Sequence, residues 1–161
     1  MTASKPDLYR DLARELAALL VGETDRVANA ANMAAVIYYG MPYLNWAGFY
    51  FRHGVELVLG PFQGKPACVR IPIGRGVCGT AAARAATVLV PDVHDFPGHI
   101  ACDGASRSEL VVPLIEAGAV LGVLDLDSPL PRRFDEHDRE GCERLAALFV
   151  EHHRQHPDAC R

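Results

Sequence analysis

The sequence predicts an α+β fold in which a central antiparallel sheet carries the N- and C-terminal helices on one face. Apolar residues recur at helical spacing near both ends of the chain, whereas two middle stretches have the patterns of strands. A short turn divides each of these stretches, which favours antiparallel pairs. With 161 residues, the chain has the size of one domain. We therefore expect a single domain over residues 1–161, with its core at about residues 24–153.

The N-terminal part of the chain predicts two helices. Ser4 is placed to cap a helix over about residues 5–21, which Gly22 ends. Its apolar face consists of Leu8, Leu12, Leu16, Leu19 and Leu20. Thr24 is placed to cap a second helix that ends at Gly40. Apolar positions of this second helix include Val27, Ala31, Ile37 and Tyr38.

Strand patterns begin at Trp46. The first antiparallel pair is WAGFYF and ELVLG, joined by a turn at His53 and Gly54, and the third strand is ACVRI. The small residues of VCGTAAARAA favour a helix, and the short apolar segment TVLV stops at Pro91. A second antiparallel pair consists of ELVVPLIE and AVLGVLDLDS.

The remaining segments are a long loop, a last helix and a tail. Residues 91–108 contain turn formers and two histidines without a period, which predicts a functional loop. A helix is expected from about Asp135 to His153, with its apolar side at Leu145, Leu148 and Phe149. The tail over residues 156–161 is expected to fray.

Composition excludes several function classes. The chain has 16 Lys and Arg against 20 Asp and Glu, and this mildly acidic balance argues against a nucleic-acid surface. Charges at Lys5, Asp7 and Arg10 interrupt any apolar run near the start, so we expect no signal peptide. A membrane span would need about 18 consecutive apolar residues, and none is present. A soluble, cytoplasmic protein is therefore expected, without membrane or nucleic-acid partners.

Cysteine usage is the most informative feature of the composition. Five cysteines are an odd number, and a permanent disulfide framework is not expected in a reducing compartment. Cys78 falls in the first turn of a helix, where the helix dipole should lower the pKa of its thiol. Cys102 lies in the long loop and Cys68 on or beside the third strand, so these three thiols could converge on one cleft. Cys142 is expected to be a buried small hydrophobe, and Cys160 is assigned no role.

Zinc is the competing use of these thiols, with His94 or His99 completing the ligand set. No C-x2-C pair occurs, and the spacings of 10 and 24 residues between Cys68, Cys78 and Cys102 do not favour a structural zinc site. We therefore expect no metal.

Acidic residues alternate along the last strand. Asp125 and Asp127 share one face of VLDLDS, about 7 Å apart, opposite Leu124 and Leu126. Two such carboxylates raise the pKa of at least one of them unless a cation lies between them. Glu109, on the pairing strand, could be a third member. Solvent-facing acids at a strand end remain an equal alternative.

Two further features suggest a binding site. Trp46, Gly48 and Tyr50 share one strand face, where a glycine between two aromatic rings can form a notch, although both rings could equally be core residues. Gly74-Arg75-Gly76 precedes a helix, whose free N–H groups and dipole can bind a small anion such as a carboxylate. A simple structural turn would have the same sequence.

The segments together resemble a known family. NWAGFYF, LGPFQGKPACVRIPIGRGVCGTAAA, LVPDVHDFPGHIACDGASRSELVVPL and GVLDLDSP, from about Asn45 to Pro129, are similar to the free methionine-(R)-sulfoxide reductases, a group of GAF domains. All three cysteines stand at the spacing of that family. Gly104 stands where serine is expected in many members.

The resemblance implies a thiol mechanism. Cys102 would attack the sulfoxide sulfur, methionine would leave, and a sulfenic acid would remain on Cys102. Cys68 would be the main resolving thiol and Cys78 a backup or a wall of the pocket. The resulting disulfide would be reduced by thioredoxin, which draws on NADPH through thioredoxin reductase, and no cofactor would be bound.

The residue patterns fit the substrate of that family. Glu109, Asp125 and Asp127 could bind the ammonium group or, if one stays protonated, donate a hydrogen bond to the sulfoxide oxygen. Trp46 and Tyr50 could enclose the methyl group. The N–H groups around Gly76, Val77 and Cys78 could bind the carboxylate, which is an inference from the helix start.

The resemblance also implies a homodimer. One alternative class is a GAF ligand-binding or redox-sensing module without turnover. A zinc-stabilised interaction protein is another.

Overall fold

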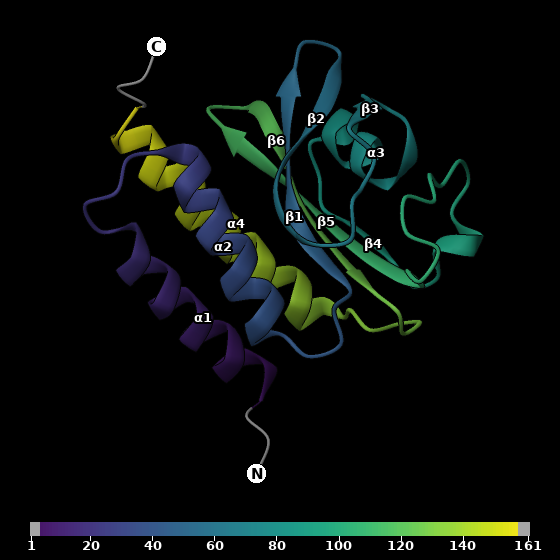
Figure 1. Cartoon of the computed structure of the whole chain (residues 1–161), viewed down its shortest axis with the longest axis horizontal. Helices are drawn as coiled ribbons and strands as arrows, with labels where there is room; N and C mark the ends of the chain where they lie inside the picture. Colours follow the sequence, from purple (N-terminus) through teal and green to yellow (C-terminus); the bar gives the residue numbers. More distant parts are fainter. Residues whose placement is uncertain (1–3, 158–161) are drawn as a thin grey trace.

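The computed structural model describes residues 4–157 and contains, within that range, one six-stranded antiparallel sheet and four α-helices (Figure 1). The strand order is β3-β2-β1-β6-β5-β4. The strands are β1 (Trp46–His53), β2 (Glu56–Gly64), β3 (Arg70–Pro72), β4 (Val88–Val90), β5 (Ser108–Glu116) and β6 (Ala119–Ser128). The helices are α1 (Lys5–Leu20), α2 (Arg26–Gly40), α3 (Gly76–Arg84) and α4 (Glu136–Gln155), with a 3-10 turn at Val93–Asp95.

The helices lie on opposite sides of the sheet. α2 packs on β1 and β2, α4 packs on β5, and α1 covers α2 and α4 from outside (Figure 1). On the other face, α3 packs against β3, β4, β5 and β6. The prediction that the N- and C-terminal helices share one face of an antiparallel sheet is therefore confirmed. No helix among residues 4–157 has the length and apolar character that crossing a membrane would require.

Strand alternation divides the interior into two layers. Ala47 and Phe49 of β1 point into the core beneath α2 and α4, whereas Trp46 and Tyr50 point toward α3. On β6, Leu124 and Leu126 belong to the first core, so Asp125 faces the second side. The core beneath α2 and α4 is built mainly from large aliphatic side chains and phenylalanines, whose burial from water contributes most of the hydrophobic stabilisation.

Several predicted elements have their expected starts and ends. Ser4 caps α1, and Asp135 caps α4 in a reciprocal capping box with Asp138. Cys142 is fully buried, as expected. TVLV supplies β4, which the sequence indicated only as a short apolar segment. The predicted fraying tail can be followed only to Pro157, and Cys160 lies outside the described residues.

The second helix was predicted with the wrong cap, and two of its four predicted apolar positions do not face the core. Asp25, not Thr24, is the N-cap and accepts a hydrogen bond from the N–H of Ala28 at 2.8 Å. Val27 is 62% exposed and Ala31 is also exposed. The buried face consists of Asn29, Ala30, Met33, Ala34 and Ile37. The prediction was therefore right for Ile37, and Tyr38 also packs against the core. Alanines occur all around this helix, so apolar spacing alone does not define its buried side.

Two smaller expectations also fail. Leu19, assigned to the apolar face of the first helix, is 41% exposed. The third strand covers Arg70–Pro72 instead of the segment ACVRI, because only these residues pair in register with Glu56–Val58 of β2. Cys68 therefore lies in the loop before the strand.

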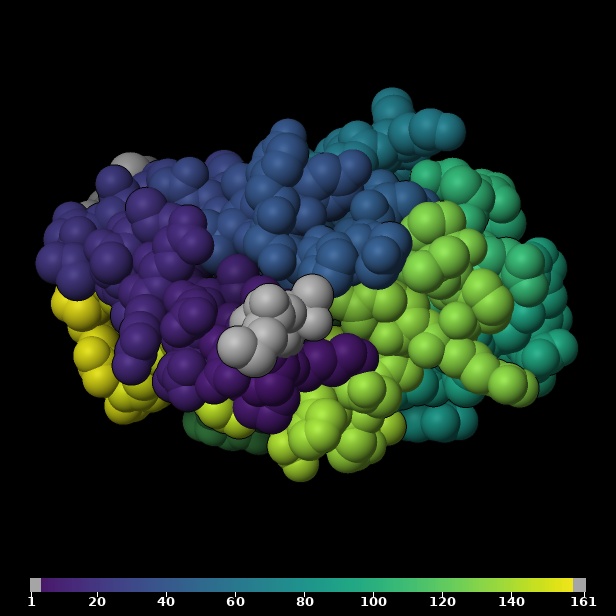
Figure 2. All heavy atoms as spheres, turned by 90° about the horizontal axis from the view of Figure 1, so that it is seen from below, coloured from purple at the N-terminus to yellow at the C-terminus, as the bar shows by residue number. Residues whose placement is uncertain are grey.

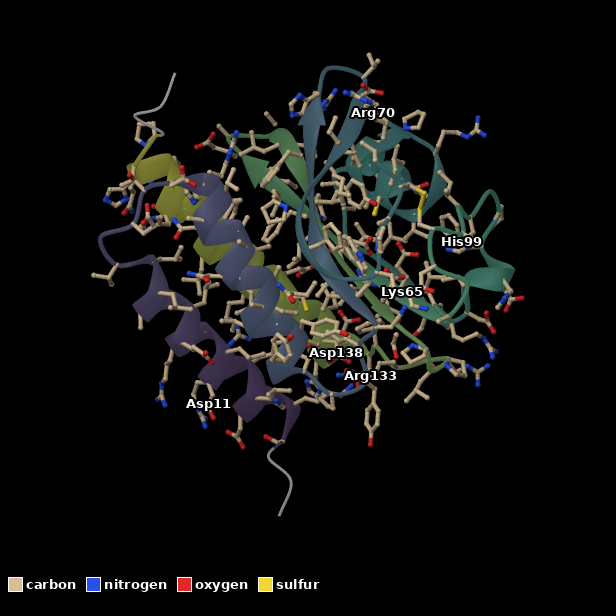
Figure 3. The ribbon with its side chains drawn as sticks, in the orientation of Figure 1. Asp11, Lys65, Arg70, His99, Arg133 and Asp138 are labelled. Atoms are coloured by element: carbon tan, nitrogen blue, oxygen red, sulfur yellow. A yellow bond between two sulfur atoms is a disulfide. The ribbon has the colours of Figure 1, made fainter. Side chains whose placement is uncertain are left out.

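A buried acid fastens the N-terminal helix to the C-terminal one. The fully buried carboxylate of Asp138 accepts hydrogen bonds from Tyr9 Oη at 2.8 Å and from Arg133 Nη1 at 3.2 Å (Figure 3). Lys5 Nζ also contacts Asp138, and it bonds Asp135 at 2.8 Å. Figure 2 shows the start of α1 lying against the segment that leads into α4. This network fixes the start of α1, which has no direct place on the sheet.

Replacing Asp138 by alanine should therefore destabilise the fold. The change leaves the largely buried Arg133 guanidinium without its anion and removes part of the capping box, which together should lower the free energy of unfolding by about 3–5 kcal/mol. Chemical denaturation at neutral pH measures this loss. The matched control is Asp11→Ala on the outer side of α1, where the 63% exposed side chain should change stability by less than about 0.5 kcal/mol. Equal effects of the two substitutions would contradict a central role for Asp138.

Candidate active site

A pocket lies between the sheet and α3, with about 530 Å³ of empty space, part of it open to solvent. Every site residue proposed from the sequence reaches it, since all but Cys68 line it and Cys68 is bonded to the lining residue Cys102. The lining residues are Trp46, Tyr50, Pro66, Ala67, Ile71, Arg75, Gly76, Val77, Cys78, His99, Ile100, Cys102, Asp103, Ser106, Glu109, Asp125 and Asp127.

Strand register explains why the acids meet there. Asp127 of β6 pairs with Trp46 of β1 on one side and with Glu109 of β5 on the other, so these three side chains form one row across the sheet. Asp125 lies in the next row, opposite Gly48. Because side chains two residues apart share a face, Asp125 points to the same side as Asp127. The pocket floor therefore carries three carboxyl groups on rigid strands.

The electrostatics of these acids match the prediction of raised pKa values. Burial raises the pKa of Asp125 to about 6. Burial, followed by repulsion from Asp125 and Asp127, raises the pKa of Glu109 well above its usual value. The pKa of Asp127 is also raised, mainly by burial and then by repulsion from Asp125. Solvent-facing acids at a strand end, the alternative interpretation, do not fit Glu109 or Asp125, which are each only 6% exposed.

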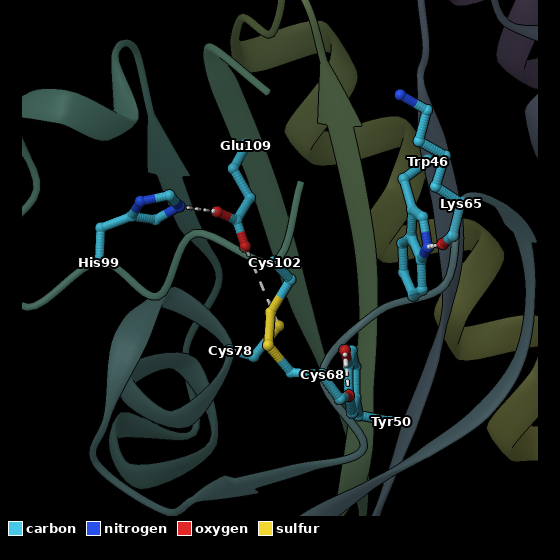
Figure 4. Close-up of a disulfide and its surroundings, with 8 residues drawn as sticks. All are labelled: Trp46, Tyr50, Lys65, Cys68, Cys78, His99, Cys102 and Glu109. Atoms are coloured by element: carbon cyan, nitrogen blue, oxygen red, sulfur yellow. Dashed lines mark hydrogen bonds and ion pairs between the residues drawn. A yellow bond between two sulfur atoms is a disulfide. The ribbon is translucent and has the colours of Figure 1, made fainter. Parts of the chain in front are cut away.

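A disulfide joins Cys68 and Cys102 at the edge of the pocket, with 5.6 Å between their Cα atoms (Figure 4). The strand β1 holds the loop that carries Cys68 at two points. Trp46 Nε1 donates a hydrogen bond to the carbonyl of Lys65 at 3.1 Å, and Tyr50 Oη donates one to the carbonyl of Cys68 at 2.9 Å. Both aromatic residues thus position the redox loop as well as lining the pocket.

The loop that carries Cys102 is held from the same strand. Asn45, directly before β1, donates from Nδ2 to Asp103 Oδ2 and to Ser106 Oγ, each at 3.0 Å. Asp103 Oδ1 in turn accepts from the N–H of Ala105 at 2.9 Å. A Cβ at Gly104 would meet no atom within 4 Å. The turn therefore has room for the serine that is expected at this position in many family members.

Cys78 is buried beside the disulfide and does not have the lowered pKa expected of a thiol at a helix start. Burial, followed by repulsion from Asp125 and Glu109, raises the pKa of its thiol well above the usual value. The thiol of Cys78 donates a weak hydrogen bond to Glu109 Oε1, 4.0 Å from Sγ. Desolvation and two neighbouring acids thus outweigh the dipole of a nine-residue helix. Cys78 is therefore a protonated thiol at neutral pH.

The start of α3 offers backbone donors to the pocket. Arg75 at the N-cap makes no side-chain capping bond, and the first hydrogen bond of the helix runs from the N–H of Gly79 to the carbonyl of Arg75. The N–H groups of Gly76, Val77 and Cys78 precede it, so the helix itself gives them no acceptor. Gly76 has φ of 62°, and an added Cβ would come within 3.1 Å of Ile100, so glycine is needed at this point.

The predicted aromatic notch at Gly48 is filled from within the protein. A Cβ on Gly48 would collide with Phe62 and with the Trp46 ring, which stacks on Phe62 with centroids 5.3 Å apart. The Trp46 and Tyr50 rings are themselves stacked at 5.9 Å. Gly48 thus allows the rings to close into a wall, and the two interpretations of Trp46 and Tyr50, as core residues or pocket residues, both hold.

Sequence patterns missed several pocket residues. His99, with Nε2 3.7 Å from Glu109 Oε2, was considered only as a zinc ligand, and burial lowers the pKa of its imidazole. Asn45 and Ser106 belong to no sequence motif that indicates a function. Asn45 only precedes a predicted strand, and Ser106 only lies in the long loop. His94, the other suggested zinc ligand, is exposed and contacts Asp92 at 2.8 Å without lining the pocket. Among the described residues, metal-ligating atoms come together at Cys78, Glu109 and Asp125, within 4.8 Å of one another.

Fold and pocket define the class of protein, because the family description for the GAF domain matches residues 12–151. A free methionine-R-sulfoxide reductase from Escherichia coli is 52% identical over 144 residues, which cover 89% of this chain and 87% of that protein. The free methionine-R-sulfoxide reductase of Saccharomyces cerevisiae is 44% identical over 154 residues, covering 91% and 86%.

A solved structure agrees with these sequence matches. The X-ray structure of free methionine-R-sulfoxide reductase from Neisseria meningitidis, in complex with its substrate, superposes with a TM-score of 0.90 at 46% identity, over 96% of this chain and 95% of that one. The chain therefore belongs to the free methionine-R-sulfoxide reductase family of GAF domains. The family resemblance and the fold class inferred from the sequence are both confirmed.

The buried acids should make stability depend on pH. The pKa of Asp125 is about 6 in the folded protein and about 4 in an unfolded chain, so its protonated form favours folding below pH 4 and this contribution is lost as the pH rises through 6. The free energy of unfolding of the parent should fall as the pH rises from 4 to 7.5. In Asp125→Asn this fall should be smaller by roughly 1–3 kcal/mol. Urea denaturation at both pH values measures the difference. In the control Asp95→Asn, at an exposed site, the pH dependence should follow the parent. Parallel curves for Asp125→Asn and the parent would contradict a raised pKa.

Proposed function

We propose that the protein reduces free L-methionine (R)-S-oxide to L-methionine through Cys102 and Cys68. The observation that carries this proposal is a cysteine pair able to form a disulfide at the edge of a pocket whose floor holds three carboxyl groups. The relatives from Escherichia coli and Saccharomyces cerevisiae carry the name of this activity, and the Neisseria meningitidis structure is described as a complex with substrate.

The pocket offers a partner for each group of the substrate. Glu109, Asp125 and Asp127 bind the ammonium group, which is the cation that their mutual repulsion favours. The carboxylate binds at the start of α3, where free N–H groups and the Arg75 side chain face the pocket. The methyl group packs against Trp46. Because both ends of the amino acid are recognised, methionine sulfoxide within a polypeptide is excluded.

The reaction proceeds in two balanced steps. In the first, the sulfur of Cys102 attacks the sulfoxide sulfur, the oxygen passes to Cys102 as a sulfenic acid, and methionine is released. In the second, the thiol of Cys68 attacks the sulfenic sulfur, the disulfide forms, and one water leaves. One of the three acids stays protonated because its pKa is raised, and it donates the hydrogen bond that polarises the S–O bond, while the ionised acids bind the ammonium group. His99 Nε2 lies 3.7 Å from Glu109 Oε2 and keeps that carboxyl group oriented.

Cys78 takes a secondary role in this scheme. Its thiol stays protonated beside the carboxyls and makes a slow nucleophile, so Cys68 is the main resolving residue and Cys78 a wall of the pocket or a reserve thiol. A protein dithiol of the thioredoxin class reduces the Cys68–Cys102 disulfide, drawing on NADPH through thioredoxin reductase, and no cofactor is bound. A cytoplasmic location is part of this proposal, because protein dithiols are kept reduced in that compartment. The homodimer that the family resemblance implied stays a prediction.

Substrate discrimination tests the proposal directly. Purified protein is offered free methionine R-sulfoxide, free S-sulfoxide and a peptide-bound sulfoxide in separate assays, with thioredoxin, its reductase and NADPH. We expect NADPH oxidation with the free R form and at least about 100-fold lower rates with the other two, because a missing charge partner or a misplaced oxygen leaves buried polar groups unpaired. Absence of turnover with all three, in folded and reduced protein, would favour the sensor alternative.

The cysteine order is tested by single-turnover experiments on pre-reduced variants. Cys102→Ser should form no methionine, because the nucleophile is absent. Cys68→Ser should form about one methionine per chain and then stall with thioredoxin, because the sulfenic acid is not resolved efficiently. Cys142→Ser, at a buried site within α4, is the control and should turn over like the parent. Methionine formation by Cys102→Ser at the parental rate would remove that residue from the nucleophile role.

A further inference from the structure

Three side chains of the pocket form an unusually compact set of metal-ligating atoms. Sγ of Cys78 and one oxygen each of Glu109 and Asp125 lie within 4.8 Å of one another, and all three residues are buried. They come from three different elements, namely α3, β5 and β6, so the backbone holds each donor independently. Figure 4 shows Cys78 and Glu109 facing each other beside the disulfide.

One oxygen of the Asp125 carboxyl group is left without a hydrogen bond. Asp125 lines the pocket and is only 6% exposed. Its Oδ1 accepts no hydrogen bond from any residue in the described range 4–157. A buried oxygen without a donor is costly, and the full desolvation penalty of such a group is about 1–3 kcal/mol. A ligand with positive charge at this position would satisfy it. The acid cluster and the orphaned oxygen thus point to the same spot.

The surroundings favour a cation there. Asp127 lines the same pocket floor and adds a third carboxyl group. His99 contacts the outer oxygen of Glu109, and burial keeps its pKa low, so its imidazole is neutral at pH 7. The guanidinium-bearing Arg75 also lines the pocket but is an exposed residue. The centre of the cluster therefore has excess negative charge whenever its acids ionise.

The donor chemistry selects a class of metal. Two carboxylate oxygens and a thiolate sulfur suit zinc or cadmium, whereas magnesium and calcium prefer oxygen ligands alone. Ligands at tetrahedral zinc lie about 3.5 Å apart, given metal–ligand distances of roughly 2.0–2.3 Å, so donors that lie within 4.8 Å of one another must approach by up to about 1.3 Å. Three protein ligands leave a fourth position for water, as in zinc sites that are open to the solvent.

We propose that the pocket in its disulfide form binds one zinc or cadmium ion through Cys78, Glu109 and Asp125. The ion replaces the thiol proton of Cys78, which is released to solvent, and no redox change is involved. Since Cys68 and Cys102 are bonded to each other, they contribute no thiolate in this form. If the proposed function holds, the ion occupies the position that the ammonium group takes in the reduced form.

Cadmium titration of the oxidised protein tests this site without any enzymatic assay. Cys160, which lies outside the described residues, is changed to serine in every sample so that its thiol does not contribute. Cadmium chloride is then added while the ultraviolet thiolate-to-cadmium charge-transfer band is followed. We expect a band that saturates at one ion per chain, is removed by zinc and is unaffected by millimolar magnesium.

Variants decide which residues form the band. Cys78→Ala should abolish it and weaken cadmium binding more than about 100-fold, because loss of even an outer-shell partner costs roughly 10–100-fold in affinity. Asp125→Asn keeps its shape and should weaken binding at least about tenfold. Cys142→Ala is the control for the other buried thiol and should retain the band. Circular dichroism and thermal unfolding confirm that each variant is folded.

Two results would overturn the site. One is a parent protein without a saturable band, and the other is a band that survives Cys78→Ala or disappears in Cys142→Ala. Neither result depends on turnover. Failure of the metal site is therefore distinguishable from failure of the proposed reductase activity.

Discussion

Three carboxyl groups held close together on one face of a sheet are the constraint around which the rest of this structure is arranged. Glu109, Asp125 and Asp127 sit on adjacent strands in fixed register, so they cannot move apart to relieve their repulsion. Burying such groups is unfavourable unless a cation or a proton neutralises them. The opposite face of the same strands supplies the compensation, because Leu110, Leu124 and their neighbours form a continuous apolar core with α2 and α4.

The second organising element is β1, which ties both redox loops to the sheet. Asn45 holds the loop of Cys102, while Trp46 and Tyr50 hold the loop of Cys68. The two cysteines are 34 residues apart in sequence, yet a strand of eight residues sets their separation in space. A rigid strand can thus fix the positions of two reactive cysteines, which loops alone would hold less accurately.

Sequence patterns predicted this architecture well where side-chain alternation carries the signal. Asp125 and Asp127 could be placed on one face, and Leu124 and Leu126 on the other, because strand geometry leaves no other choice. The face of α2 was predicted correctly only at Ile37 and Tyr38, since alanine at so many positions makes the periodicity ambiguous. The pKa of Cys78 was predicted in the wrong direction, because its acid neighbours come from β5 and β6, distant in sequence. The positions of His99 and Ser106 could not be predicted, because the loop that carries them has no periodic sequence pattern and its conformation is set by tertiary contacts.

The electrostatics of the pocket suit a site that must both bind a cation and deliver a proton. Burial and mutual repulsion raise the pKa values of these acids, which favours a proton held within the cluster that can be donated toward an oxygen. An arriving ammonium group or metal ion favours the ionised forms and draws protons out of the cluster. The carboxyls lie on strands and the disulfide-forming thiols lie in loops, so a change of redox state leaves the strand framework of this cluster in place. The sheet consequently sets the positions of the three carboxyl groups, whereas the two disulfide-forming thiols depend on the loops that carry them.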